Sequence, residues 1–199
     1  MSKIKTIKAA TYRGYPIIVS KGEPLECRTD IQDKVIDLTE QQVREHRRVF
    51  WERWDLRFPE SRQYPDANKI IEGFTDSLNA FLKRENCDSA YLRKREQETS
   101  LNPHEHFLYL HSGDATRSHV KHLNKATELL AGRLDINADD AKGLIHYAGS
   151  GMIERNSPEF IQQKADCIRA GSYLAKTVSN PPPKGIRLFN SSRLSKTPN

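Results

Sequence analysis

The sequence has 199 residues, of which 36% are hydrophobic and 29% are charged, and it carries a net charge of +6. This length allows one domain with a normal core and an additional arm. A basic excess is typical of proteins with a polyanionic partner such as nucleic acid, although composition alone does not establish one. Three distant cysteines without a CxxC pair argue against a disulfide framework and favour a reducing compartment. No apolar run reaches membrane-spanning length and no apolar signal core is visible, so we expect a soluble, cytoplasmic protein with no membrane partner.

The first 38 residues are expected to form a separate arm, because glycines and prolines interrupt their one apolar run, "YPIIV". A helix is expected to begin at Thr39, which has the spacing of a capping box with Gln42. The chain then changes to a strand over 49–58, ended by Pro59. Alternation along this strand places its apolar side chains on one face and its charged side chains on the other, namely Arg53, Asp55 and Arg57.

The remaining elements follow from apolar periodicity and turn residues. Helices are expected over 65–84 and 117–134, strands over 88–98, 104–111 and 143–149, and a turn with a short helix over 135–144. Asn156, Ser157 and Pro158 mark the start of a last helix that runs to about residue 178. This order predicts an α+β fold in which a small, mainly antiparallel sheet is flanked by helices. The expected organisation is an arm (1–38), a core domain (39–180) and a basic C-terminal tail (181–199).

Two histidines in "PHEHFLYLH" are candidate metal ligands. Side chains at i and i+2 of a strand share a face, so His104 and His106 lie side by side, whereas Glu105 points the other way. A divalent cation needs at least one more ligand, and Asp55 and Glu96 are the candidate oxygen donors. An HxH pair on a strand is a weak signal by itself, because strands also contain histidines without a metal role.

The other histidines are assigned no ligand role. His111 has the opposite parity and faces away from the pair. His119, His122 and His146 are expected to be solvent-facing or structural, and His46 is expected on a helix surface.

The stretch "RAGSYLAK" adds a candidate nucleophile. On a helix, Arg169, Tyr173 and Lys176 lie on one side. Nearby cations favour the ionised form of a tyrosine and attract a phosphate, and a bound metal polarises a phosphoryl oxygen. The two patterns together therefore supply the parts for covalent phosphoryl transfer. The alternative is that Tyr173 is a core residue that anchors the helix.

Several blocks occur in the order found in the YagK/YfjJ family of phage replication proteins, which the sequence resembles over about residues 48–194. The blocks are "DLRFPESRQYPD", "YLRKREQ", "PHEHFLYL", "KGLIHYAG", "ERNSPEF", "SYLAK" and "GIRLFNSSR". The family looks like a branch of the HUH endonucleases, which nick one DNA strand and become linked through a tyrosine to the 5′-phosphate. The resemblance implies an HUH-like nickase domain over 39–180.

The resemblance also implies roles for individual residues. His104 and His106 match the pair that holds Mg²⁺ or Mn²⁺, Tyr173 matches the nucleophile, and Lys176 matches a lysine that helps to place the substrate. Asp55 and Glu96 match acidic positions, and we infer that one of them is the third metal ligand. Arg187 and Arg193 match basic positions near the C-terminus and are assigned to contacts with DNA phosphates. Arg169 is assigned to DNA binding because it lies four residues before Tyr173, on the same side of the helix.

Three departures from the family pattern stand out. Glu105 occupies the apolar middle position of the HUH motif, so this side of the strand is expected to be open to solvent unless the carboxylate is paired. Arg57 replaces a usual histidine. "TVSNPPPKG" replaces a usual basic stretch after "SYLAK".

The leading hypothesis is a metal-dependent, site-specific DNA nickase of a phage or mobile element that acts on single-stranded or locally melted DNA. It would initiate rolling-circle replication or nick a competing replicon, with a host helicase as a possible partner. The alternatives are a catalytically inactive DNA-binding regulator with the same fold, and a protein-interaction module that uses the N-terminal arm.

Overall fold

The structure, a computed structural model, describes residues 4–58, 67–97, 103–112, 119–177 and 188–193. The helices in these ranges are α1 (Thr29–Glu45), α2 (Ala67–Arg84), α3 (His119–Leu134), α4 (Ala138–Leu144) and α5 (Phe160–Gly171), followed by a 3₁₀ turn (Ser172–Ala175). The strands of the main sheet are β7 (Arg48–Arg57), β8 (Ser89–Gln97), β9 (Pro103–Ser112), β10 (Ile145–Glu154) and β11 (Phe189–Ser191). Three short ribbons precede α1: β1 (Thr6–Lys8) with β6 (Glu26–Arg28), β2 (Thr11–Tyr12) with β3 (Tyr15–Pro16), and β4 (Val19–Ser20) with β5 (Glu23–Pro24).

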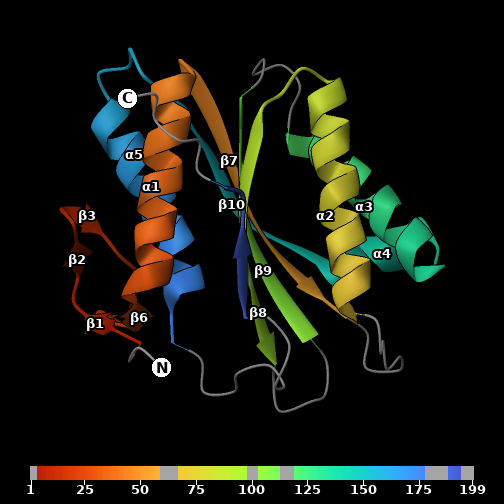
Figure 1. The fold of residues 1–199 in the computed structure, drawn as a ribbon, viewed down its shortest axis with the longest axis horizontal. Coiled ribbons are helices and arrows are strands. Elements are labelled where there is room, and N and C mark those ends of the chain that lie inside the picture. The colour runs from red at the N-terminus through yellow and green to blue at the C-terminus, as the bar shows by residue number, and fades with distance from the viewer. Residues whose placement is uncertain (1–3, 59–66, 98–102, 113–118, 178–187, 194–199) are drawn as a thin grey trace.

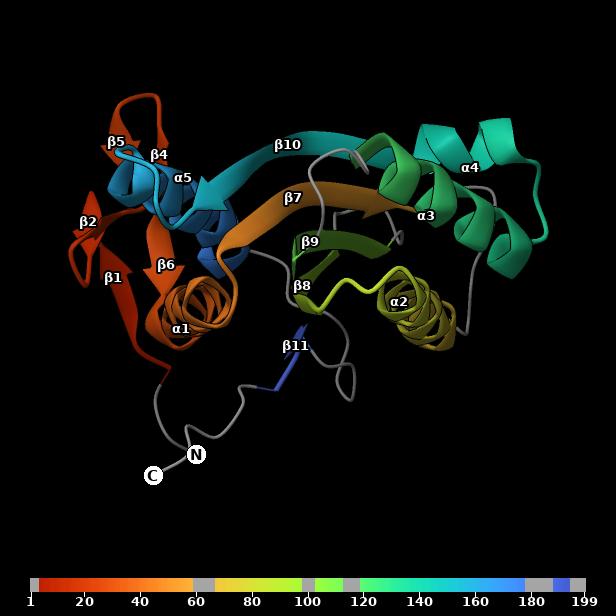
Figure 2. The same cartoon turned by 90° about the horizontal axis from the view of Figure 1, so that it is seen from above.

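The main sheet has the strand order β10-β7-β9-β8-β11, and every neighbouring pair is antiparallel. Helices cover both faces: α1 and α5 lie on one side, and α2, α3 and α4 lie on the other (Figures 1 and 2). The ribbons of the N-terminal segment pack beside α1 and α5 (Figure 1). The α+β fold with a mainly antiparallel sheet is therefore confirmed.

Each face of the sheet has its own hydrophobic core, because successive side chains of a strand point to opposite faces. On β9, Leu108 and Leu110 pack in the core that contains α1 and α5. Phe107 and Tyr109 pack in the core beneath α2 and α3. The parity of a residue on β9 therefore decides which half of the molecule it faces.

The N-terminal segment differs from the expected arm. The helix begins at Thr29, ten residues before the expected start at Thr39, and the expected boundary at residue 38 falls inside it. Thr39 does not cap the helix; its hydroxyl donates to the Val35 carbonyl (2.8 Å) in the helix interior. Ile17 and Cys27, which precede the helix, are buried in the same core as α1. This part of the chain completes one hydrophobic core.

Two elements of the C-terminal part also differ. The last α-helix begins at Phe160, with Glu159 as its N-cap residue, and ends at Gly171 instead of residue 178. The strand expected over 143–149 is β10, which extends to Glu154. Within the expected tail, β11 pairs with β8 and forms an edge of the sheet. Among the described residues, no helix is both long and apolar enough to cross a membrane.

Candidate active site

The histidine pair lies on β9, between β7 and β8, on the face that α1 and α5 cover. His104 and His106 are both buried, and their ring centroids are 4.3 Å apart. Asp55 stands directly opposite His106 in the register of β7 and β9, and its Oδ1 lies 2.6 Å from Nδ1 of His106. His104 and His106 lie on the same face of β9 as Leu108 and Leu110, so the site adjoins the hydrophobic core that contains α1 and α5.

Asp55, His104 and His106 can each offer one ligand atom, and these atoms all lie within 4.8 Å of one another. Two imidazole nitrogens and a carboxylate oxygen suit a divalent transition ion, so the residues fit Mn²⁺ better than Mg²⁺, the two metals that the resemblance implies. Glu96, on β8, approaches from the other side: its Oε2 lies 3.4 Å from Nε2 of His106. Both acidic residues suggested by the sequence are thus beside the pair, and Asp55 completes the three-residue group.

Charges at this site favour ionised forms. Burial raises the pKa of Glu96, but His106 and Lys94 outweigh this and lower it to about 2. Burial would lower the pKa of His106, yet Asp55 and Glu96 raise it. The pKa of Asp55 is lowered because His106 and Arg53 outweigh its burial. Asp55 and Glu96 therefore stay ionised, which is the form of a carboxylate that binds a cation.

Tyr173 lies on the 3₁₀ turn that follows α5, not on the α-helix itself. Its ring meets the His106 ring edge to face, with centroids 4.9 Å apart. Lys176 Nζ lies 5.0 Å from the centroid of the tyrosine ring, so these two residues come together as expected. Arg169 instead pairs with Asp166 (3.0 Å) at an exposed position.

The N-terminal segment holds both ends of this turn. The Ile18 backbone N–H donates to Ser172 Oγ (2.8 Å), and Ser172 Oγ donates to the Arg169 carbonyl (2.6 Å). At the other end, the Thr177 N–H donates to the Glu26 carbonyl (2.8 Å). The ribbons before α1 therefore position the candidate nucleophile.

Two residues of the site were missed by the sequence analysis. The guanidinium carbon of Arg53 lies 4.3 Å from the centroid of the Tyr173 ring, and Arg53 Nη2 lies 3.6 Å from Asp55 Oδ2. Lys94 is fully buried, and its Nζ donates to Glu96 Oε1 (3.1 Å) and to the Lys176 carbonyl. Strand alternation could have found both residues, because Arg53 lies on the same face of its strand as Asp55, and Lys94 lies on the same face as Glu96.

A family model described as the YagK/YfjJ C-terminal domain matches residues 7–192. The chain belongs to this family. No curated protein and no solved structure matches it significantly.

The match corrects the extent of the resemblance. The motifs of the YagK/YfjJ likeness begin near residue 48, whereas the family domain begins at residue 7. The family domain thus includes α1 and the ribbons before it, in agreement with their contacts to the tyrosine turn.

An open cavity of about 620 Å³ adjoins the site in this YagK/YfjJ domain. Tyr173, Arg53 and Arg169 form part of its lining, together with Ile18 and Val19 from the N-terminal segment. A cavity of this size accommodates a small ligand or part of a larger one. Tyr173 lies between this cavity and the metal-ligand group, so a bound molecule reaches the tyrosine from here.

Glu105 is not open to solvent, contrary to one expectation. It points away from the histidine pair, as expected, and is 1% exposed. Its Oε1 accepts a hydrogen bond from Arg95 Nε and lies 3.6 Å from Arg93 Nη1. The charge of Glu105 is therefore compensated by two arginines of β8, and burial is possible without an apolar residue.

The remaining predicted residues lie around the site or away from it. Arg57 is exposed and stands opposite His104 in the register of β7 and β9. Arg193 is exposed, and Arg187 lies outside the described residues. His146 is exposed, His46 follows the end of α1, and the side chain of His119 lies outside the described residues. His111 faces away from the pair, toward α2 and α3. His122 is buried next to His111 on that face of the sheet.

Proposed function

We propose that this YagK/YfjJ domain is a site-specific, metal-dependent DNA nickase that becomes linked through Tyr173 to the 5′-phosphate of the cut strand. The observation that supports it most is the contact between Tyr173 and His106, because it brings a nucleophilic side chain to a group of metal ligands. A tyrosine that served only as a core anchor would have no need of a carboxylate and two histidines beside it.

Asp55, His104 and His106 would hold a divalent ion. When bound, the metal polarises a phosphoryl oxygen of the substrate. The chain itself supplies Arg53 and Lys176, whose cationic groups lie on the Tyr173 ring and are placed to bind a phosphate oxygen. Lys94 would hold the end of the tyrosine turn beside Glu96, since its Nζ donates to both Glu96 Oε1 and the Lys176 carbonyl.

The proposed reaction exchanges one phosphoester bond for another. Tyr173 Oη attacks the phosphorus of a DNA phosphodiester and forms a phosphotyrosine bond, while the bond to the 3′-oxygen breaks. The phenol proton is released to water, and the leaving 3′-oxygen takes up a proton and becomes a 3′-hydroxyl. No oxidant or energy-rich cofactor is needed, because the phosphotyrosine conserves the energy of the broken bond.

The partner is DNA with a single-stranded or locally melted target site, in the cytoplasm of a bacterial host. The free 3′-hydroxyl would prime rolling-circle replication of a phage or mobile element, or the nick would damage a competing replicon. A host helicase would supply the unwinding.

The test is incubation of the full chain with a pool of labelled single-stranded oligonucleotides and Mn²⁺. A covalent protein–DNA adduct that survives denaturation is expected, and Tyr173→Phe should abolish it while retaining DNA binding. Sequence-specific binding without any adduct would instead favour a catalytically inactive DNA-binding regulator. Glu105 departs from the HUH pattern, but its charge is compensated by Arg93 and Arg95 away from the histidine pair, which supports the nickase over the inactive regulator.

A further inference from the structure

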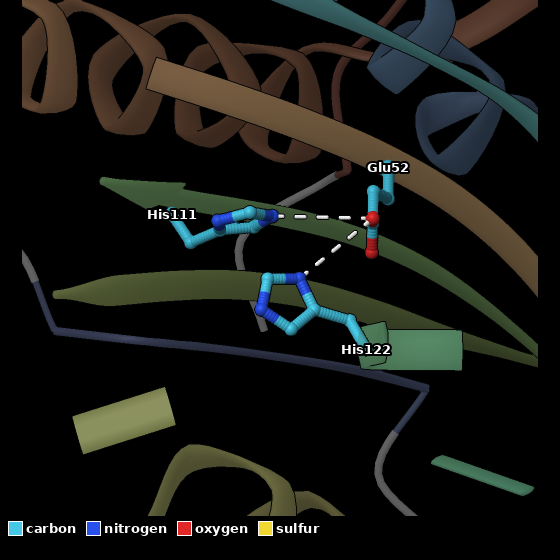
Figure 3. A group of neighbouring side chains, drawn as sticks. All are labelled: Glu52, His111 and His122. Atoms are coloured by element: carbon cyan, nitrogen blue, oxygen red, sulfur yellow. Dashed lines mark ion pairs between the residues drawn. The ribbon is translucent and has the colours of Figure 1, made fainter. Parts of the chain in front are cut away.

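A second group of potential metal ligands lies on the opposite face of the main sheet. It consists of Glu52 on β7, His111 on β9 and His122 in the first turns of α3 (Figure 3). Their ligand atoms lie within 4.8 Å of one another. Figure 3 shows both imidazole rings directed at the carboxylate of Glu52. The group is distinct from the candidate active site, because His106 and His111 have opposite parity on β9.

All three side chains are removed from solvent. Their exposed fractions are 3% for Glu52, 5% for His111 and 4% for His122. Glu52 Oε1, both ring nitrogens of His111 and Nδ1 of His122 are buried, and none of them has a hydrogen-bond partner within the part of the chain that the structure describes. Buried polar atoms without partners are costly, so this arrangement calls for a further group that satisfies several of them at once.

The distances favour a cation over direct hydrogen bonds. Glu52 Oε1 lies 4.0 Å from His111 Nε2 and 3.9 Å from His122 Nδ1, which is too long for hydrogen bonds. Ligands of a tetrahedral zinc ion at about 2.0–2.1 Å lie roughly 3.3 Å from each other. The distances from Glu52 to the two imidazoles therefore need to shorten by roughly 0.6–0.7 Å for the three side chains to share one ion.

The surroundings hold the rings in place for this role. The His111 and His122 rings are nearly perpendicular, at 88°, with centroids 4.4 Å apart. Phe50 stacks on His111, and Phe81 meets His122 edge to face. These ring contacts limit the rotation of both imidazoles and give them an apolar surrounding, as in a structural metal site.

We propose that Glu52, His111 and His122 bind a divalent transition-metal ion of the Zn²⁺ type, separate from the nicking site. Two neutral imidazoles and one carboxylate form a borderline ligand set that suits zinc better than magnesium. Because the ligands come from β7, β9 and α3, the ion fastens α3 to the sheet. The inference does not depend on the proposed nickase function, since it uses none of the residues of that site.

The test removes the first site and counts the ions that remain. A full-length His104→Ala/His106→Ala variant, stripped with a chelator and loaded with Zn²⁺, should retain one ion per chain by mass spectrometry of the metal. X-ray absorption at the zinc edge should show two imidazole ligands, and Zn²⁺ should raise the Tm by several degrees. Absence of bound Zn²⁺ in this variant, with the fold intact by circular dichroism, would overturn the proposal.

Glu52→Gln in the same background is the matched variant, because it keeps the side-chain volume and loses the anionic ligand. We expect it to weaken Zn²⁺ binding by roughly tenfold or more. An unchanged affinity would show that zinc binds elsewhere and would contradict the assignment. If Glu52→Gln does not fold, His122→Gln is measured in its place, with the same expected loss and the same contrary result.

Discussion

The guanidinium carbon of Arg53 lies 4.3 Å from the centroid of the Tyr173 ring. The same side chain reaches toward Asp55, with Nη2 3.6 Å from Oδ2. Arg53 thus connects the candidate nucleophile with a candidate metal ligand, and its position on the cavity lining allows it to meet a phosphate there. A planar, permanently charged guanidinium suits both contacts, since it stacks on an aromatic ring and binds oxygen anions.

Arg53→Met is expected to slow formation of the Tyr173–DNA adduct by about 3- to 30-fold, which corresponds to a loss of roughly 0.5–2 kcal/mol of cation–π stabilisation. The rate is measured in a single turnover with Mn²⁺. Arg48→Met is the control, because Arg48 lies on the same strand but pairs with Glu154 (2.7 Å) away from the site. Equal rates for the two variants would show that Arg53 has no part in the reaction.

Glu105→Gln is expected to lower stability by roughly 3 kcal/mol, because it removes the buried carboxylate charge that pairs with Arg93 and Arg95. Adduct formation below the Tm should stay within about threefold of the parent rate, since Glu105 points away from the histidine pair. Urea unfolding and the adduct assay measure the two effects. The control is Glu72→Gln, because the Glu72 carboxylate is exposed and its ion pair with Arg93 contributes less than about 1 kcal/mol. Loss of the adduct with unchanged stability would mean that Glu105 acts in the site.

Much of the fold was predictable because successive side chains of each strand point to opposite faces of the sheet. On β9, alternation alone separated His104 and His106 from Glu105 and assigned each to the correct face. The parity of β7 likewise placed Asp55 toward the pair. Helix boundaries were less predictable where capping residues were ambiguous: Thr39 has a capping sequence but lies in the middle of α1.

The site was only partly predictable, because several contacts arise from packing between distant segments. Sequence spacing brought Tyr173 and Lys176 together, but nothing in it showed that Arg53 would cover the tyrosine. A buried lysine such as Lys94 is also unexpected from polarity, since lysine is rarely buried without a partner. The pairing of Glu105 with arginines of β8 required the strand register, which the sequence does not state.

Gly171→Ala is expected to destabilise the protein by about 1–3 kcal/mol. A Cβ at Gly171 would lie 2.7 Å from Val35 Cγ1 and 2.8 Å from Leu108 Cδ2, so α5 would have to move away from the sheet. Gly132→Ala is the control, because a Cβ there meets nothing within 4 Å and alanine favours the helix by roughly 0.5–1 kcal/mol. Thermal unfolding should therefore shift in opposite directions, and a shift in the same direction for both variants would contradict this packing.

The contribution of Glu40 to stability should disappear in acid. Burial raises the pKa of Glu40, but Tyr15 and Lys164 outweigh this and hold it below its usual 4.5. A carboxyl group whose pKa is lower in the folded state stabilises the protein above its unfolded pKa, and this stabilisation is lost as the pH falls through the folded pKa. The difference in Tm between the parent and Glu40→Gln should thus shrink below about pH 4.5. A difference that stays constant in acid would contradict the role of the Glu40 contacts.

The most direct test of the nickase proposal is to locate the DNA attachment site. The adduct formed with Mn²⁺ is digested with trypsin and nuclease, and the peptides are analysed by mass spectrometry. The proposal predicts a nucleotide attached through its 5′-phosphate to the peptide AGSYLAK, residues 170–176, in which Tyr173 is the sole tyrosine. Attachment to any other residue, or the same adduct in Tyr173→Phe, would contradict it.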